Sequence, residues 1–226
     1  VGRSPLMAEI AMKVAQYRSL PHPVLILGET GVGKELIAQA LHSGRAGAFC
    51  AVNCASFRDN LHLLESDLFG YEKGAFTGAN QIKLGLFQVA RDGTVFLDEL
   101  HHFDLGAQAK MLRVLQEKKI RRVGATQEID VEFRLIASAK PDLQAQVKRG
   151  EFLEDLFYRM NHLILTIPPL RDRPEDIEPI VAQLCAKHTE ATGDRKTFLM
   201  RTIRAMEQYP WPGNVRELIS CVNKLL

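Results

Sequence analysis

The sequence has few cysteines and no cysteine or histidine pattern that is typical of a metal site. Cys50, Cys54, Cys185 and Cys221 form no Cys-x-x-Cys pair, and the seven histidines include no His-Glu-x-x-His motif. We therefore predict no structural metal site. Cys50 and Cys54 flank an apolar run, which favours buried free thiols, and so few cysteines in 226 residues fit a reducing cytoplasm.

The sequence also lacks a signal peptide and any apolar run of membrane-spanning length, so we expect no membrane partner. The formal net charge is +2, and charge alone therefore gives no indication of nucleic-acid binding. The longest basic cluster, at residues 118–122, fits a solvated helix end about as well as a phosphate contact. Because the chain begins at Val1 and stops inside a helical pattern at Leu226, we expect it to be a domain of a longer protein.

What is present is an alternation of short apolar runs and helical patterns. Strands are predicted at residues 24–27, 49–53, 95–97, 134–137 and 163–167, with helices at 35–41, 61–68 and 108–117. This alternation predicts an α/β subdomain at residues 1–170, with a parallel sheet flanked by helices. After Pro168-Pro169-Leu170 only helices follow, at 174–188, 197–208 and 214–226. We therefore predict a small all-helical subdomain at residues 171–226.

A phosphate-loop pattern follows the first predicted strand and opens the first helix. It consists of Gly28, Glu29, Thr30, Gly31, Val32, Gly33 and Lys34. Glycines let backbone N–H groups point at a phosphate, Lys34 adds a charge near the β- and γ-phosphates, and the helix start adds its positive dipole end. The alternative is an incidental glycine-rich turn. Glu35 replaces the usual Ser or Thr, so a hydroxyl ligand for Mg²⁺ is missing.

A pair of acids, Asp98 and Glu99, ends the buried strand at residues 95–97. Asp98 suits a magnesium partner, in part through water, and Glu99 suits a base that orients water toward the γ-phosphate. Such a pair alone often only caps a helix. Together with the phosphate loop it favours hydrolysis of ATP with Mg²⁺ over nucleotide storage.

An unbroken Gly74-Ala75-Phe76-Thr77-Gly78-Ala79 hexapeptide lies between these two motifs. Small residues around one Phe and one Thr form a tip with a single apolar contact and a single hydroxyl, which suits a moving loop that touches another macromolecule. The alternative is a glycine-rich surface turn. The neighbouring nucleotide motifs favour the first interpretation.

Taken together, these motifs resemble the central AAA+ domain of bacterial enhancer-binding proteins, the activators of sigma-54 RNA polymerase. The resemblance covers essentially the whole chain. It also includes the motifs at residues 68–70, 96–99, 168–171 and 211–218. It implies an AAA+ P-loop NTPase fold, ATP and Mg²⁺ as cofactors, a helical lid, and Gly74 to Ala79 as the loop that binds sigma-54 in the RNA polymerase holoenzyme.

The resemblance also implies roles by position. Asn53 would be the switch residue whose amide controls Glu99, Arg216 would be the lid arginine that senses the phosphates, and Arg159 would be an arginine finger acting on a neighbouring subunit. A finger that acts across a boundary implies a ring, with a hexamer expected. DNA would be bound by a C-terminal domain outside this chain.

Two departures from the family pattern bear on hydrolysis. Leu153 stands where the family usually has a second interface arginine, and Ala139-Lys140 stand where it usually has Thr-Asn. They motivate one alternative, a regulator that binds nucleotide but hydrolyses little of it. A second alternative is an AAA+ remodeller of other proteins, against which the hexapeptide argues.

Overall fold

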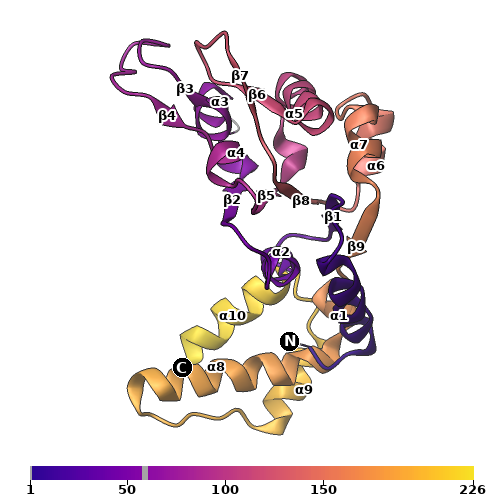
Figure 1. Ribbon diagram of the computed structural model, residues 1–226. Coiled ribbons are helices and arrows are strands. Elements are labelled where there is room, and N and C mark those ends of the chain that lie inside the picture. The colour runs from indigo at the N-terminus through magenta and orange to yellow at the C-terminus, as the bar shows by residue number, and fades with distance from the viewer. Residues whose placement is uncertain (1, 58–60) are drawn as a thin grey trace.

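The computed structural model describes residues 2–57 and 61–226. A five-stranded sheet forms the centre of the first subdomain (Figure 1). Its strands are β1 (Val24–Leu27), β2 (Phe49–Asn53), β5 (Thr94–Asp98), β8 (Arg134–Ala139) and β9 (Leu163–Thr166). They run parallel in the order β2-β5-β8-β1-β9, so the predicted strands and their parallel pairing are confirmed.

Two apolar layers cover the sheet, and the side-chain alternation of the strands separates them. Leu25 and Leu97 face one layer, whereas Ile26 and Phe96 face the other. The first layer is built by α3 (Leu61–Phe69), α4 (Leu86–Val89), α5 (Leu105–Glu117), α6 (Leu143–Lys148) and α7 (Glu154–Met160). The second is built by α1 (Pro5–Arg18) and α2 (Lys34–His42). The strands are therefore apolar on both faces, as a doubly covered parallel sheet requires.

Helix α1 was not among the predicted elements, although its sequence carries the signals of a helix. Ser4 accepts a hydrogen bond from the N–H of Met7 at 3.3 Å, and proline occupies the first helical position. Met7, Ile10 and Val14 form the buried stripe. Ser4 also contacts the second subdomain, because its N–H and its hydroxyl donate to Asp176 at 2.8 and 2.9 Å.

Arg134 fastens two helix ends to the sheet. It is 3% exposed at the start of β8, and its guanidinium donates to the carbonyls of Tyr17, Arg18 and Leu41. These carbonyls lie at the carboxyl ends of α1 and α2, where positive charge is favoured. Burial lowers the pKa of Arg134 to about 10, so the side chain stays charged at neutral pH.

The second subdomain is helical and has a core of its own. It contains η3 (Leu170–Asp172), η4 (Pro174–Asp176), α8 (Ile177–Thr192), α9 (Met200–Gln208) and α10 (Asn214–Leu225). Ile177, Val181, Ile203 and Leu218 are among its buried residues. Figure 1 shows these helices as a separate lobe below the sheet, next to α1 and α2.

Two short antiparallel ribbons extend from the opposite end of the first subdomain (Figure 1). One joins β3 (Gly70–Tyr71) to β4 (Lys83–Leu84), and the other joins β6 (Lys119–Arg121) to β7 (Glu128–Asp130). A β-bridge between Tyr71 and Val123 holds the two ribbons side by side. The 3₁₀ turns η1 (Cys54–Phe57) and η2 (Leu100–His102) follow β2 and β5.

All four cysteines are free thiols, with Cys54 and Cys185 buried. Burial raises the pKa of Cys54, which keeps that thiol protonated. Within residues 2–57 and 61–226, no cluster of histidine, cysteine or acidic residues could hold a metal ion by itself. No helix in the same ranges is long and apolar enough to cross a membrane.

Candidate nucleotide site

The predicted phosphate loop connects β1 to α2. Gly31 and Gly33 have φ angles of +80° and +103°, a region that glycine enters without steric cost. Lys34 opens α2 and is 7% exposed. Its Nζ donates to the carbonyls of Gly28 and Glu29 at 2.9 and 3.0 Å, so the ammonium lies inside the turn that surrounds it.

The loop, the acidic pair and the lid border one cavity of about 310 Å³. Lys34, Asp98, Glu99 and Arg216 all line it, although they come from three distant parts of the sequence. Burial lowers the pKa of Lys34, and the charges of Asp98 and Glu99 oppose that shift. The positive charge of Lys34 and the negative charges of Asp98 and Glu99 therefore meet in one cavity, which Arg216 borders from the lid.

A buried serine connects the two acids at the end of β5. The Ser138 hydroxyl donates to the Asp98 carboxylate and accepts a hydrogen bond from the N–H of Glu99 at 3.0 Å. Glu99 has a φ of +57°, which is uncommon for a residue with a side chain. Ser138 thus fixes both the carboxylate of the first acid and the backbone of the second.

Asn53 lies beside Asp98 in the register of β2 and β5. Its Oδ1 accepts a hydrogen bond from the N–H of Ala55 at 2.9 Å, so the amide caps its own turn. The Glu99 carboxylate instead lies 3.6 Å from Nε2 of His102. The switch role of Asn53 therefore remains a prediction.

The adjacency of His101 and His102 on a helix predicts rings that point in different directions. The structure contradicts this, because the ring centroids are 4.3 Å apart. The two residues lie in the 3₁₀ turn η2, where the His102 ring also lies beside Glu99. Burial lowers the pKa of His101 to about 4, and neither ring nitrogen of His101 has a hydrogen-bond partner in the described part of the chain.

The carboxylate of Glu29 faces the lid. It accepts two hydrogen bonds from Arg171 at 2.6 and 2.9 Å and one from Asn214 at 3.1 Å, and these contacts lower the pKa of Glu29. Asn214 is fully buried, has a φ of +53°, and also bonds the Thr30 carbonyl and the Leu170 N–H. This asparagine joins the phosphate loop to the lid, a role that we did not assign from the sequence.

The lid lies close to the middle of the phosphate loop. A Cβ atom built on Gly31 would lie 2.4 Å from the carbonyl oxygen of Gly213. The N–H of Arg216 donates to the Gly31 carbonyl at 3.3 Å, and the Arg216 side chain is exposed beside the cavity. The position of α10 therefore depends on the conformation of the loop.

The remaining loop residues differ in environment. Val32 is 4% exposed and belongs to the apolar layer under α1 and α2. Thr30 and Glu35 border the cavity with exposed side chains. Glu35 accepts a hydrogen bond from Gln39 at 3.4 Å, one helical turn along α2.

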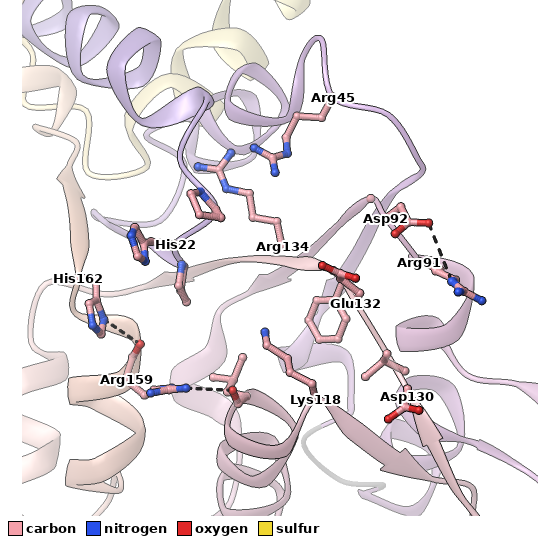
Figure 2. A pocket seen from close by; sticks show the side chains of 16 residues that line it. His22, Arg45, Arg91, Asp92, Lys118, Asp130, Glu132, Arg134, Arg159 and His162 are labelled. Carbon is pink, nitrogen blue, oxygen red and sulfur yellow. Dashed lines mark hydrogen bonds and ion pairs between the residues drawn. The ribbon is translucent and has the colours of Figure 1, made fainter.

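Arg159 does not reach this cavity. It borders a different pocket, which is shown in Figure 2 and is formed where β1, β5, β8 and β9 begin. The cavity lined by Lys34 and Asp98 instead lies where the strands end. Its guanidinium donates to the Leu115 carbonyl at 3.3 Å and its side chain is exposed. Within one copy of the chain, Arg159 thus cannot act on the nucleotide cavity.

The hexapeptide forms a compact turn at the end of the β3–β4 ribbon. Gly74 donates to the Ala79 carbonyl at 2.9 Å, and Ala79 donates to the Phe76 carbonyl at 3.0 Å. The Phe76 side chain is 47% exposed and its ring meets Tyr71 edge-on at 4.9 Å. Thr77 is exposed at the tip. Phe76 and Thr77, the two side chains of the turn that could contact a partner, are thus exposed to solvent.

The β6–β7 ribbon supports this turn from the side. The Glu72 N–H donates to the Val123 carbonyl at 3.0 Å, and Arg122 forms an ion pair with Glu72 at 2.8 Å. A Cβ atom on Gly124 would lie 2.8 Å from that of Ala75, so the ribbons are in close contact. Movement of one ribbon therefore has to displace the other.

The two departures from the family pattern have structural explanations. Leu153 packs against the main core at the start of α7, and its N–H donates to the Gln108 side chain at 2.7 Å. Ala139 is fully buried at the end of β8, and Lys140 is exposed after it. Ser138 supplies the polar contact to Asp98 from one position earlier.

The sheet order, the phosphate loop between β1 and α2, and the lid above it define a P-loop domain of the AAA+ class. The chain belongs to the sigma-54 interaction domain family, whose model matches residues 1–166, and an AAA+ ATPase lid domain model matches residues 171–226. Both expectations drawn from the resemblance, the family and the fold class, are confirmed.

Individual relatives agree with this assignment. The chain is 44% identical over 227 residues to a Nif-specific regulatory protein of Klebsiella pneumoniae, covering 99% of this chain and 43% of that protein. It is 46% identical over 225 residues to regulatory protein AtoC of Escherichia coli K12, covering 98% and 48%. The chain therefore spans less than half the length of these relatives.

A solved structure of similar fold is NtrX from Brucella abortus in complex with ATP. It has a TM-score of 0.90 and 31% sequence identity, and the match covers all of this chain and 51% of that one. NtrX has also been crystallised in complex with ADP.

Proposed function

We propose that this chain is the ATP-hydrolysing module of a sigma-54-dependent transcription activator. The observation that carries the proposal is the convergence of Lys34, Asp98, Glu99 and Arg216 on one cavity, in a chain that also presents Phe76 and Thr77 on an exposed turn. The kinship with the Nif-specific regulator and AtoC supports it.

The residues of the cavity divide the work of hydrolysis. Backbone N–H groups of the phosphate loop and the Lys34 ammonium bind the phosphates, and Glu99 accepts a proton from the attacking water and orients it. Arg216 contacts the phosphates from the lid. Because the Arg216 N–H already bonds the Gly31 carbonyl, nucleotide binding and lid position are coupled.

Asp98 fits a role in holding Mg²⁺. Mg²⁺ takes one or two protein carboxylates together with phosphate oxygens and keeps several waters, which suits the half-buried Asp98 at the edge of the cavity. The Ser138 hydroxyl donates a hydrogen bond to one oxygen of the Asp98 carboxylate and so fixes the orientation of that carboxylate. When bound, the ion neutralises charge that develops on the phosphates.

Arg159 would act on a second copy of the chain, since its own cavity is at the other edge of the sheet. A ring of copies, with six expected, places the Arg159 edge of each copy against the nucleotide cavity of the next. A change at the γ-phosphate would then move the hexapeptide turn and the ribbon that supports it. The turn would act on sigma-54 in the closed promoter complex, while DNA is held by a domain outside this chain.

The decisive experiment is the capture of purified sigma-54 by the chain loaded with a transition-state ATP mimic. We expect capture by the unmodified chain and none by Lys34→Ala, which loses the phosphate-binding cation. Thr77→Ala and Phe76→Ala should hydrolyse ATP normally but fail to capture sigma-54. Normal capture by both loop variants would contradict the activator function.

A second candidate function is nucleotide binding with little hydrolysis, and Leu153 favours it. With an apolar residue at the position of an expected interface arginine, transition-state charge has one fewer partner. A steady-state ATPase assay at protein concentrations that form rings separates the two functions. Turnover no faster than that of Glu99→Ala would favour the binding-only function.

A further inference from the structure

The pocket that holds Arg159 is rich in basic side chains. It has a volume of about 890 Å³ and lies at the edge where the parallel strands begin (Figure 2). Its fixed positive charges come from Arg45, Arg91, Lys118, Arg134 and Arg159, and its negative charges from Asp92, Asp130 and Glu132. The cations outnumber the acids, so the pocket suits an anionic group.

Most of these cations already have partners within the chain. Arg134 bonds three backbone carbonyls, as described above. Arg45 donates to the carbonyl of Arg18 at 2.9 Å. Arg91 lies 3.9 Å from the carboxylate of Asp92, in an exposed ion pair. These three side chains therefore contribute little free charge to a ligand.

Lys118 differs from them. Its ammonium takes part in no hydrogen bond and no ion pair within the described ranges, and it lies over the face of Phe133, 5.9 Å from the ring centroid. Figure 2 shows the side chain pointing into the pocket, between Arg159 and Glu132. Partial desolvation and the positive charge of Arg159 lower the pKa of Lys118, while the negative charge of Glu132 opposes that shift. The ammonium thus lies near a second cation as well as near one acid.

The backbone of Lys118 is also unusual. The residue caps α5 with a φ of +55°, a conformation that favours glycine. A cation near a helix carboxyl end interacts favourably with the helix dipole, but the left-handed backbone of a residue with a side chain costs more than this interaction returns. Helix capping alone thus does not account for lysine here.

Lys118 and Arg159 converge because both are positioned by the end of α5. Arg159 bonds the carbonyl of Leu115, in the last turn of the helix that Lys118 caps. Leu153, at the position of the second expected interface arginine, is apolar and packs against the core, so it adds no charge to this pocket. We propose that Lys118 is a second cation of the interface site, contacting with Arg159 the phosphates of a nucleotide bound to a second copy of this chain. This inference rests on the proposed ATPase function.

The test variant is Lys118→Gly, because glycine is the residue best suited to a φ of +55° and the fold should be retained. We expect turnover per assembled subunit to fall about 100-fold, the loss typical for removal of one charge-stabilising donor. ATP affinity of dilute, unassembled subunits should not change, since their own cavity lies at the other edge. Lys119→Ala, which removes the exposed neighbouring charge, is the matched control and should keep full turnover.

Mixing experiments test whether Lys118 acts across the boundary. Lys118→Gly mixed with Glu99→Ala should regain turnover, because some interfaces then combine an intact base with an intact cation pair. Lys118→Gly mixed with Arg159→Ala should regain little, since both variants are defective at the same edge. Light scattering confirms ring assembly in each mixture, and Lys118→Arg should retain most of the turnover.

Each failure has a distinct meaning. If rings of Lys118→Gly turn over ATP at the wild-type rate while rings of Arg159→Ala are inactive, the role of Lys118 is overturned and the ATPase function stands. Loss of ring assembly in Lys118→Gly overturns it as well, because the residue would then be an assembly contact. No turnover by verified rings of the unmodified chain overturns both the inference and the proposed function.

Discussion

Ser138 illustrates how a single buried hydroxyl can support a site that lacks its expected polar residue. It is fully buried, and its oxygen contacts both the carboxylate of Asp98 and the N–H of Glu99. Loss of the Ser138 hydroxyl leaves the half-buried carboxylate of Asp98 and the half-buried N–H of Glu99 without this partner. The geometry of the acidic pair thus depends on one side chain behind it.

We predict that Ser138→Ala lowers the turnover number about tenfold, which corresponds to about 1.4 kcal/mol, the scale of one buried hydrogen bond. The concentration of Mg²⁺ needed for half-maximal turnover should rise, because Asp98 is no longer fixed. ATP affinity without Mg²⁺ should stay the same. Ser66→Ala, which removes another buried serine hydroxyl far from the cavity, is the control, and an equal effect in it would contradict the role of Ser138.

His101 predicts how stability depends on pH. Burial lowers its pKa to about 4, with His102, Lys140 and Lys34 acting in the same direction and Asp142 opposing them. Between the unfolded value of about 6.5 and the folded value, the unfolded chain binds a proton that the folded chain does not. The free energy of unfolding is therefore unaffected by His101 above pH 6.5, and it falls as the pH decreases from 6.5 toward 4.

We expect this residue to reduce the free energy of unfolding by at most about 1.4 kcal/mol for each pH unit below 6.5. Urea denaturation at pH 7, 6 and 5 measures the slope. His101→Leu removes the titrating group and should give a flatter profile over the same range. Identical slopes for both proteins would show that other groups cause the pH dependence.

At the scale of elements, the lid is held by close backbone contact with the phosphate loop. Asn214 bonds residues on both sides of this contact, and Gly31 leaves no space for a Cβ atom beside the Gly213 carbonyl. The close contact between α10 and the phosphate loop therefore requires glycine at position 31.

We predict that Gly31→Ala lowers the free energy of unfolding by about 2–5 kcal/mol, the sum of a left-handed backbone penalty and an overpacking penalty. Gly193→Ala is the control, since its φ of +75° is similar but nothing lies within 4 Å of its added Cβ. That variant should lose only about 1–2 kcal/mol. Urea denaturation without nucleotide measures both, and equal losses would argue against the collision.

At the scale of the whole molecule, Glu99 and Arg159 lie at opposite edges of the sheet. Glu99 borders the cavity at the strand ends, and Arg159 borders the pocket at the strand beginnings. In the function that we propose, the two residues would therefore serve one active site only when it is shared by two copies of the chain.

We predict that Arg159→Ala and Glu99→Ala are each inactive in rings and that their mixture regains turnover. In an equal mixture, about one interface in four combines an intact base with an intact arginine, so activity should approach about a quarter of the unmodified value. Turnover measured against mixing ratio, with mixed rings verified, checks this. Absence of rescue at every ratio would contradict a shared site.

The sequence by itself determined the sheet strands, the phosphate loop, the acidic pair and the family, because these depend on local patterns. Short apolar runs, glycines at fixed spacing and two adjacent acids can each be recognised from a few consecutive residues, without knowledge of what they contact in the fold. Helix α1 carried equally local signals in Ser4, Pro5 and its apolar stripe, and could have been predicted.

Only the tertiary structure decided which side chains meet. Ser138 reaches Asp98 because β8 pairs with β5, and Asn214 reaches the phosphate loop because the lid folds back over it. Lys118 and Arg159 share a pocket because α7 packs beside the end of α5. The Ser138–Asp98 contact joins residues 40 positions apart and the Asn214–Thr30 contact residues 184 positions apart. Such distances are set by the packing of whole elements, which no local pattern encodes.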